Sequence, residues 1–502
     1  MEQLKIPEQV RENRMGTEPV GKVLRSMAIP MMISMMIQAL YNVVDSIYVS
    51  RLGEEALNAV SLAFPLQNLM IGFGTGTGLG MNALLSRYLG AKKKELADRA
   101  ANTGIFLFIV SFLVFALIGA TLSKPFFRAI TRVEGISAEV TETAQVAAPE
   151  TAEAELIAAQ TAPAEQPEEA AEKTDAEKVE QIISYGTDYT TICLVFSFGI
   201  FLQFCFERML QGTGRAKLSM ITQTTGAVIN IILDPILIFG WLGFPRLEVK
   251  GAAIATVTGQ IVSATMALIM NLKKNPDVHL SIREILHPVG SMIKEIYKIA
   301  FPSILMMSIG SVLNFLLNKI LIAFTTTATA VYGAYFKLQS FFFMPIFGLN
   351  NAMIPVISYN YGARKKERVI RTFKLAVITG ICIMVCGTLI FEIFPRTLLG
   401  FFNASEDMLK IGMPALRIIG THFIFASVCI ISGSVCQAIG NPMHSLITSI
   451  LRQIVVLLPA AWLLSLTGKL ELVWLAFPIS EIVSLIFSLI FLKKTLKKLD
   501  TF

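Results

Sequence analysis

The sequence predicts an all-α, polytopic membrane protein with about twelve transmembrane helices in two halves of six. Of its residues, 54% are hydrophobic and only 16% are charged, and the mean hydropathy is +0.63. Apolar runs of about 20 residues, long enough to cross a hydrocarbon core of ~30 Å, recur along the chain. In addition, two long segments of the chain copy each other. These observations define the fold class before any motif is considered.

Twelve apolar runs are expected to span the membrane, six in each half. In chain order they lie near residues 25–48, 57–86, 101–122, 187–209, 218–240, 251–272, 296–324, 331–357, 373–394, 412–437, 445–466 and 470–492. The six cysteines all fall inside these runs, where small apolar packing is their ordinary role.

The internal repeat aligns two segments without a gap at an offset of 272 residues. The matching residues are Ala28, Pro30, Asn42, Leu66, Gln67, Gly90, Ala91, Lys93, Lys94, Glu95 and Arg99, which recur as Ala300, Pro302, Asn314, Leu338, Gln339, Gly362, Ala363, Lys365, Lys366, Glu367 and Arg371. Both copies end in a basic loop, GAKKKE at residues 90–95 and GARKKE at residues 362–367. Repeats of whole multi-helix units are typical of transporters, with the transport path between the repeats.

Charge placement predicts the orientation in the membrane. With the N-terminus inside, the inner segments hold about 28 of the 43 Lys and Arg residues, as the positive-inside rule requires. Both basic loops and both termini are then cytoplasmic, and each repeat has an even number of spans. The isoelectric point of about 9.0 therefore reflects orientation and does not favour nucleic-acid binding.

An acidic insertion separates the two parts of the first half. Gln211 matches Gln437 at an offset of 226 instead of 272, so the first half carries about 46 additional residues. Residues 134–180 are rich in Ala, Glu, Thr and Pro, and we predict a disordered outer loop there, with a short helix as an alternative near residues 170–183. A periplasmic contact, a cation-attracting tether and a tolerated insertion all remain open. The predicted domains are residues 1–273, including this insertion, and residues 274–502, with an inner linker at 274–294.

Two aspartates are expected well inside the membrane, Asp45 in the first span and Asp234 in the fifth. An ionised carboxylate in hydrocarbon is costly, so both are candidates for a functional role. Counted at 1.5 Å per residue, Asp45, Asp234 and Thr256 lie roughly 8–9 Å below the outer boundary. The three side chains therefore share one level.

Each of these residues belongs to a polar stripe along one helix face. The stripes comprise Ser34, Gln38, Asn42 and Asp45; Ser61, Asn68, Thr75 and Asn82; Thr222, Gly226, Asn230 and Asp234; and Thr256, Gln260 and Ser263. Polar faces cannot point at lipid, so we expect them to enclose a hydrated pocket. Hydrogen bonding between helices explains the amides and hydroxyls equally well, but it explains the carboxylates poorly.

The oxygen set of Asp45, Asn230, Asp234 and Thr256 predicts a cation site. Two close carboxylates cannot both stay ionised and unpaired, so they share a proton or bind a sodium ion. The residues predict no other metal or cofactor. Candidates for the substrate cavity are Gln38, Asn42, Asn68, Thr75, Gln260, Met306 and Phe341.

The second half does not repeat this site, because Leu317 stands where Asp45 would be. Its plausible intramembrane charges are Lys319, Lys337, Arg452 and Glu481. Glu481 is expected to pair with Lys337 or Arg452, either as a structural pair or as a functional switch. In the first half, the glycine run at residues 72–80 sits inside a span, and we expect it to serve close helix packing.

Several stretches resemble the multidrug and toxic compound extrusion (MATE) family, and most of all its bacterial Mep-like efflux branch. These stretches are NVVDSIYVSRLG at 42–53, NIILDP at 230–235, GAAIAT at 251–256, LQSFFFMP at 338–345 and YNYGAR at 359–364. The resemblance covers nearly the whole chain except the acidic insertion. It implies two six-helix bundles related by a pseudo-twofold axis along the membrane normal.

The resemblance also implies a function. Members of the family export cationic amphipathic compounds in exchange for protons or sodium ions, and the protein is expected to act as a monomer in the bacterial cytoplasmic membrane. In archaeal and DinF-like members the ion site matches Asp45, Asn230, Asp234 and Thr256. Another branch uses acids on the seventh and tenth helices, which this sequence lacks. A flippase for a lipid-linked precursor is the alternative function, whereas an intramembrane enzyme or a structural scaffold is disfavoured.

Overall fold

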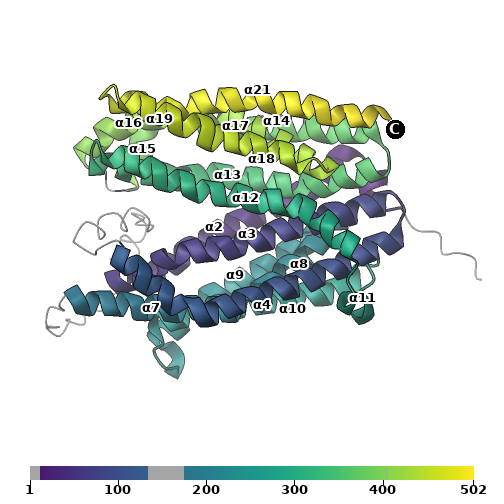
Figure 1. The fold of residues 1–502 in the computed structure, drawn as a ribbon, viewed down its shortest axis with the longest axis horizontal. Helices are drawn as coiled ribbons and strands as arrows, with labels where there is room; N and C mark the ends of the chain where they lie inside the picture. Colours follow the sequence, from purple (N-terminus) through teal and green to yellow (C-terminus); the bar gives the residue numbers. More distant parts are fainter. Residues whose placement is uncertain (1–11, 134–174, 403, 502) are drawn as a thin grey trace, which may run out of the picture.

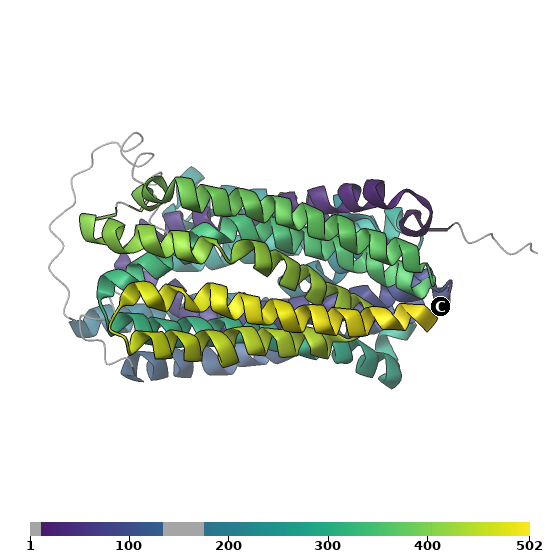
Figure 2. The same ribbon diagram turned by 90° about the horizontal axis from the view of Figure 1, so that it is seen from above.

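The computed structural model describes residues 12–133, 175–402 and 404–501, and its regular structure in these ranges is helical. The long helices lie side by side along the long axis of the molecule in both views (Figure 1, Figure 2). In Figure 1 the helices of residues 20–274 fill mainly the lower part and those of residues 290–501 mainly the upper part. The predicted all-α class is confirmed.

The described part of the first repeat contains seven longer helices and two short ones. In chain order they are α1 (Arg14–Thr17), α2 (Val20–Ser50), α3 (Glu54–Gly90), α4 (Lys94–Val133), α7 (Asp175–Val195), α8 (Phe198–Gly212), α9 (Ala216–Phe239), η1 (Trp241–Gly243) and α10 (Glu248–Lys274). The predicted inner linker contains the short surface helix α11 (Ile282–Leu286).

The second repeat has the same succession of long helices with more interruptions. Its elements are α12 (Gly290–Ile322), α13 (Thr326–Gly362), α14 (Lys366–Ile393), α15 (Pro395–Gly400), α16 (Glu406–Gly420), α17 (Phe423–Ile439), α18 (Pro442–Ile450), the π-helical turn η2 (Leu451–Leu457), α19 (Leu458–Ser465), α20 (Leu470–Trp474), α21 (Ala476–Leu496) and η3 (Lys497–Thr501).

The helices account for the predicted twelve spans. Ten described helices are long and apolar enough to cross a membrane by themselves. The pairs α7–α8 and α16–α17 are each bent by 44° at a short break, and each pair passes the same test as one span. In a bilayer the backbone must satisfy its own hydrogen bonds, which is why long apolar runs form helices there.

The acidic insertion falls mostly outside the described residues. A disordered loop was expected to extend to Glu180, but α7 already begins at Asp175. The expectation of a loop is therefore wrong for residues 175–180. The alternative of a helix agrees with the structure over residues 175–183, which form the start of α7. The division into domains at residues 273 and 274 stays a prediction.

The two repeats meet through their first two helices. Helix α2 packs on α13, and α3 packs on α12. The offset of 272 makes α2 equivalent to α12 and α3 equivalent to α13, so a twofold relation between the repeats requires both contacts. The glycine run of α3 lies on this interface: a Cβ atom at Gly76 would stand 3.0 Å from the carbonyl oxygen of Ala300 in α12. Gly80 approaches the backbone of Ile296 in the same way. The predicted packing role of these glycines is confirmed.

The two basic loops lie at the same end of the molecule, which we call the basic-loop end. Here the last turns of α3 and α13 cross in backbone contact. A Cβ atom at Gly90 would collide with the carbonyl group of Tyr359, and one at Gly362 would collide with that of Arg87. The offset of 272 relates both glycines and both of these neighbours, so the crossing is symmetric. The molecule is closed at this end.

A segment ahead of α2 reinforces this closure. Residues 12–18, called the N-terminal strap below, contact both repeats. Asn13 Nδ2 donates to the Thr213 carbonyl oxygen of the first repeat at 2.9 Å. From the second repeat, Arg368 donates to the carbonyl oxygens of Met15 (2.9 Å) and Glu18 (2.7 Å). Glu12 forms ion pairs with Lys92 at 3.5 Å and Lys365 at 3.6 Å, one from each basic loop.

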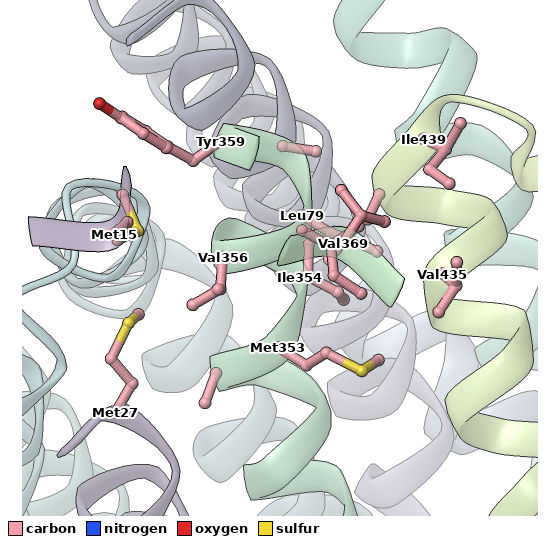
Figure 3. Packing of buried hydrophobic residues seen from close by; sticks show 14 of the residues in the cluster. Met15, Met27, Leu79, Met353, Ile354, Val356, Tyr359, Val369, Val435 and Ile439 are labelled. Carbon is pink, nitrogen blue, oxygen red and sulfur yellow. The ribbon is translucent and has the colours of Figure 1, made fainter. Parts of the chain in front are cut away.

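A buried apolar cluster also joins the repeats near this end. Met15 and Met27 from the N-terminal part lie near Met353 and Tyr359 of α13 (Figure 3). Val435 and Ile439 of α17 belong to the same cluster. The closed end is thus held by apolar packing, by backbone contact and by the hydrogen bonds of the strap.

Candidate functional site in the first repeat

The candidate ion site lies where α9 packs closely on α10. Gly226 allows this approach, because a Cβ atom there would stand 2.7 Å from the carbonyl oxygen of Gly259 and would collide with the hydroxyl group of Ser263. Ser263 Oγ donates to the Thr222 carbonyl oxygen at 2.8 Å. The polar stripes of the fifth and sixth spans therefore face each other, as predicted.

Asn230 is the centre of the site. Its Nδ2 donates to Thr256 Oγ1 at 3.2 Å and lies 3.4 Å from Asp234 Oδ1. Asn230 is 3% exposed and Asp234 is fully buried. Three of the four predicted site residues are therefore in direct contact, and their positions on two helices are fixed by one amide.

Asp45 approaches this group from α2. Helix α2 packs on α9, and the carboxyl groups of Asp45 and Asp234 lie close enough to interact electrostatically. Three acceptor oxygens of this group have no hydrogen-bond donor among the residues that the structure describes: Asp45 Oδ1, Asn230 Oδ1 and Asp234 Oδ2. Unpaired buried acceptors are costly, so the set calls for a proton, a cation or water.

A small cavity adjoins the site. It measures about 50 Å³, counted as the space open to the centres of water molecules, and a site needs roughly 10–15 Å³ of such space for one water. Its polar lining includes Gln38, Gln203, Gln223, Asn230, Thr256 and Gln260. Gln223 Nε2 donates to Gln38 Oε1 at 2.9 Å, which connects α9 to α2. The cavity can therefore hold several water molecules against the site.

The composition of the site fits a hard cation through oxygen ligands. Among the described residues, no group of three or more His, Cys, Asp and Glu side chains is placed to hold a metal ion. A sodium ion would therefore need the Asn230 amide oxygen and the Thr256 hydroxyl group besides the two carboxylates. A proton would need the carboxylates alone.

Sequence reasoning overlooked one carboxyl group. Glu207 of α8 is 4% exposed, and its Oε1 accepts from Gln203 Nε2 at 3.1 Å and from Thr222 Oγ1 at 3.2 Å. Thr222 lies twelve residues before Asp234 on α9, or roughly 18 Å along that helix. Glu207 therefore lies deeper along α9 than Asp234, and Gln203 connects it to the cavity. The signal was the spacing i, i+4, i+8 of Gln203, Glu207 and Gln211.

The predicted substrate-cavity residues do not form one group. Gln38 and Gln260 line the cavity. The others, Asn42, Asn68, Thr75, Met306 and Phe341, lie outside its lining. Asn42 and Phe341 are exposed, whereas Asn68, Thr75 and Met306 are partly buried. A role for these five in binding cargo between the repeats stays a prediction.

The second repeat carries a different charge cluster. Leu317, at the position equivalent to Asp45, is fully buried. Glu481 pairs with Arg452, whose Nη1 is 3.5 Å from its Oε1, so Arg452 is the partner and Lys337 is not. Lys337 and Lys319 instead lie over aromatic rings, Phe402 and Phe315 respectively.

The fold and these buried carboxyl groups define a class, that of multi-helix membrane transporters. A family model, MatE, matches residues 30–152, 174–236 and 302–463. The chain belongs to the MatE family and is a transporter, not an enzyme.

Curated relatives and solved structures agree with this assignment. The multidrug export protein MepA of Staphylococcus haemolyticus is 25% identical over 91% of this chain and 89% of its own. An FAD transporter of Shewanella oneidensis is 24% identical over 92% of both chains. A solved outward-facing multidrug resistance MATE transporter, 24% identical, shares the fold with a TM-score of 0.79 over 99% of this chain and 100% of that chain. A crystal structure of MATE in the bent conformation is 26% identical, with a TM-score of 0.76 over 96% of both chains.

Proposed function

We propose that this transporter is a secondary active antiporter that exports cationic amphipathic compounds in exchange for protons or sodium ions. The observation that carries the proposal is the set of three unpaired buried acceptors on Asp45, Asn230 and Asp234. The relatives named multidrug export proteins support a drug-like cargo. Because another relative is named an FAD transporter, the comparisons support transport more strongly than they support any one cargo.

The mechanism couples the site to the opposite repeat. Arrival of a cation neutralises Asp45 and Asp234 and changes how α2 packs on α9. Helix α2 also packs on α13 of the second repeat, so a change in its position acts on the interface between the repeats. The cation thereby favours one of two conformations, open at the basic-loop end or at the other end. Cargo then leaves on the outer side.

The expected setting is the bacterial cytoplasmic membrane with both termini in the cytoplasm. The excess of Lys and Arg in the inner segments supports this orientation, and it makes the basic-loop end cytoplasmic. A single chain is expected to carry out transport.

The function is tested by efflux of a cationic dye from proteoliposomes. Asp45→Asn and Asp234→Asn are each expected to reduce ion-driven efflux to the rate seen without an ion gradient. Asp188→Asn is the matched control, because Asp188 is a partly buried carboxylate of α7 that pairs with Lys250 at 3.2 Å and does not line the cavity. It should retain efflux. Full ion-driven efflux by both site variants would contradict the proposal.

The same assay identifies the coupling ion. Efflux driven by a sodium gradient at constant pH indicates sodium, and efflux driven by a pH gradient without sodium indicates protons. Thr256→Val adds an independent reading, because it removes an oxygen that a sodium ion would need but a proton would not. In a sodium-coupled protein this variant raises the sodium concentration required for half-maximal efflux.

A flippase for a lipid-linked precursor is the alternative function, and it predicts a basic cavity for pyrophosphate. The lining of the described cavity includes amide, hydroxyl and aromatic side chains, with no Lys or Arg among them. This lining favours the antiporter.

A further inference from the structure

The second repeat contains a buried charge cluster that the proposed mechanism does not use. Glu481 lies on α21 and is 2% exposed, and His422 lies at the break between α16 and α17 and is 6% exposed. Arg452 projects from the π-helical turn η2, a distortion that frequently marks functional sites. The three residues come from three separate elements and meet inside the helix bundle.

Hydrogen-bond geometry determines which ring nitrogen of His422 carries a hydrogen. Tyr335 has one hydroxyl proton, and it donates this proton to Gln339 Oε1 at 2.6 Å. The Tyr335 oxygen also lies 3.1 Å from His422 Nε2, so it must accept there and His422 Nε2 must carry a hydrogen. In a neutral imidazole the other nitrogen, Nδ1, is then a bare acceptor.

That bare acceptor faces a second acceptor. His422 Nδ1 lies 3.9 Å from Glu481 Oε2. Among the described residues, Nδ1 has no hydrogen-bond partner, and Glu481 Oε1 has only the ion pair with Arg452. Rings of Phe343, Phe423 and Phe477 lie around the imidazole, so water has little access. A lone pair facing a carboxylate in such surroundings is unfavourable, and one added proton satisfies both groups.

Other titratable groups around Glu481 do not supply that proton. Arg452 is a cation whose proton stays in place, and it balances the charge of the carboxylate. Cys429 of α17 contacts the Glu481 carboxyl group, and Tyr335 of α13 is committed to Gln339. The cluster is therefore neutral as Arg452⁺, Glu481⁻ and neutral His422, and it becomes singly positive when a proton arrives.

The internal repeat places this cluster opposite the ion site. The offset of 226 that relates Gln211 to Gln437 also relates Arg452 to Gly226. In the sixth helices the offset is 222, because eight residues join α9 to α10 and four join α19 to α20, so Glu481 corresponds to Gly259. Both of these positions lie on the facing surfaces of α9 and α10, beside Asn230 and Thr256. Each repeat thus holds buried polar groups between its own fifth and sixth helices, with different residues.

We propose that Glu481 and His422, balanced by Arg452, form a proton-binding site in the second repeat that is separate from the site of Asp45 and Asp234. The proton lies between His422 Nδ1 and Glu481 Oε2. The existence of the site does not depend on the proposed antiport. The effect of the site on transport rests on the proposed antiport, because a cluster that becomes positive on protonation repels cationic cargo between the repeats.

The test is magnetic resonance of the full chain in lipid with isotope-labelled histidine. The protein has only 4 histidines, and His422→Gln assigns the resonances of His422 by their loss. Over roughly pH 5–9, where histidine and buried carboxyl groups titrate, the ¹⁵N shifts report which ring nitrogen holds a proton. We expect hydrogen on Nε2 throughout and a change at Nδ1 as the pH falls.

Two variants test the partner. Glu481→Gln removes the charged acceptor and should abolish or displace the change at Nδ1, and Glu481→Asp should shift its midpoint. Ser480→Ala is the matched control, because Ser480 is equally buried on the same helix and bonds only to the Phe477 carbonyl group. It should leave the titration unchanged. A His422 with hydrogen on Nδ1 throughout, or with no change over this range, would overturn the proposal.

Discussion

At the scale of single residues, the neutral Asn230 organises the candidate site. Its amide nitrogen is shared between Asp234 and Thr256, while its oxygen has no donor. The side chain therefore orients one carboxylate and one hydroxyl group and still offers an oxygen ligand. Asp45 and Asp234 supply the charge, and Asn230 supplies the geometry.

Glu207 provides the first prediction. Glu207→Gln keeps an oxygen that can accept from Gln203 and Thr222 but cannot exchange a proton, so the fold should survive while ion transfer fails. We expect ion-driven efflux to fall at least about a hundredfold, the lower range for loss of a proton-transfer group. The melting temperature should stay near the wild-type value. Unchanged efflux with normal folding would remove Glu207 from the ion path.

Residue-level prediction from sequence worked where a charge stood alone in an apolar run. Asp45 and Asp234 were singled out because both carboxylates belong to polar helix faces and lie at one counted depth below the outer boundary. Glu207 was missed because it lies two residues before the expected end of its span, where charges are ordinary. Of the two partners expected for Glu481, only contact geometry could select Arg452.

At the scale of elements, the close contact of α9 with α10 holds the site together. Gly226→Val should force these helices apart, because a Cβ atom there collides with Ser263. The expected destabilisation is about 1–3 kcal/mol, seen as a lower melting temperature. Gly310→Ala is the matched control on α12, since nothing lies within 4 Å of its Cβ position, and it should be neutral or slightly stabilising. Equal effects of the two changes would contradict the packing argument.

The hydrogen bonds of Arg368 are predicted to stabilise the N-terminal strap more than the ion pairs of Glu12 do. Arg368→Ala removes hydrogen bonds from a charged donor to two carbonyl groups, at a cost of about 1.5–3 kcal/mol, whereas exposed ion pairs such as those of Glu12 contribute about 0–1 kcal/mol. Hydrogen exchange of residues 12–18 should therefore accelerate about 10- to 100-fold in Arg368→Ala. In Glu12→Gln it should accelerate less than about fivefold. The reverse order would show that the charges hold the strap.

The ion pairs of Glu12 also predict how hydrogen exchange of the strap changes with pH. The positive charge of Lys365 lowers the pKa of the Glu12 carboxyl group below its ordinary value of 4.5. Because the pKa is lower when the strap is bound, the contribution of this group is complete above about pH 4.5 and is lost as the pH falls through the lowered pKa. Near neutral pH, exchange of the strap should therefore not change with pH through the titration of this group. Glu12→Gln should remove the acid-dependent part of the exchange rate.

Helix interruptions were the least predictable elements. The break at Phe196–Ser197 contains neither Gly nor Pro, and Gly420 before the break at Thr421–His422 is one of many glycines in the spans. The π-helical turn at Leu451–Leu457 has the sequence of an ordinary apolar run. One of these distortions carries Arg452 and another His422. Helix existence was predictable, whereas helix irregularity was not.

At the scale of the whole molecule, the internal repeat predicted the relation of the two halves. The constant offset of 272 implies that the first helices of the two halves have the same lengths and the same orientation in the membrane. The contacts of α2 with α13 and of α3 with α12 agree with this prediction. The symmetric crossing at Gly90 and Gly362 depends on direct contact between the backbones of α3 and α13. Sequence similarity alone does not reveal such a contact. The closure of the basic-loop end is therefore a result of the structure.

This closure predicts the effect of a cross-link. In a chain without its native cysteines, the pair Glu12→Cys and Lys365→Cys is joined by a reducible, thiol-specific cross-linker that spans the length of the two lost side chains. This cross-link ties the strap to the second repeat and should stop efflux until a reductant is added. Glu12→Cys with Lys92→Cys, joined by the same reagent, ties the strap to the first repeat and is the matched control, since both lysines pair with the same carboxylate. Only the first cross-link should prevent the repeats from separating. Equal inhibition by both would contradict this account.

The central claim is that one buried carboxylate pair binds the coupling cation and that cargo binding depends on its occupancy. The most direct measurement is the affinity of the purified protein for a cationic dye, determined as the proton and sodium concentrations are varied separately. The account predicts that one of these cations weakens dye binding in the wild type and has no such effect in the Asp45→Asn, Asp234→Asn double variant. Equal competition in both proteins would contradict it.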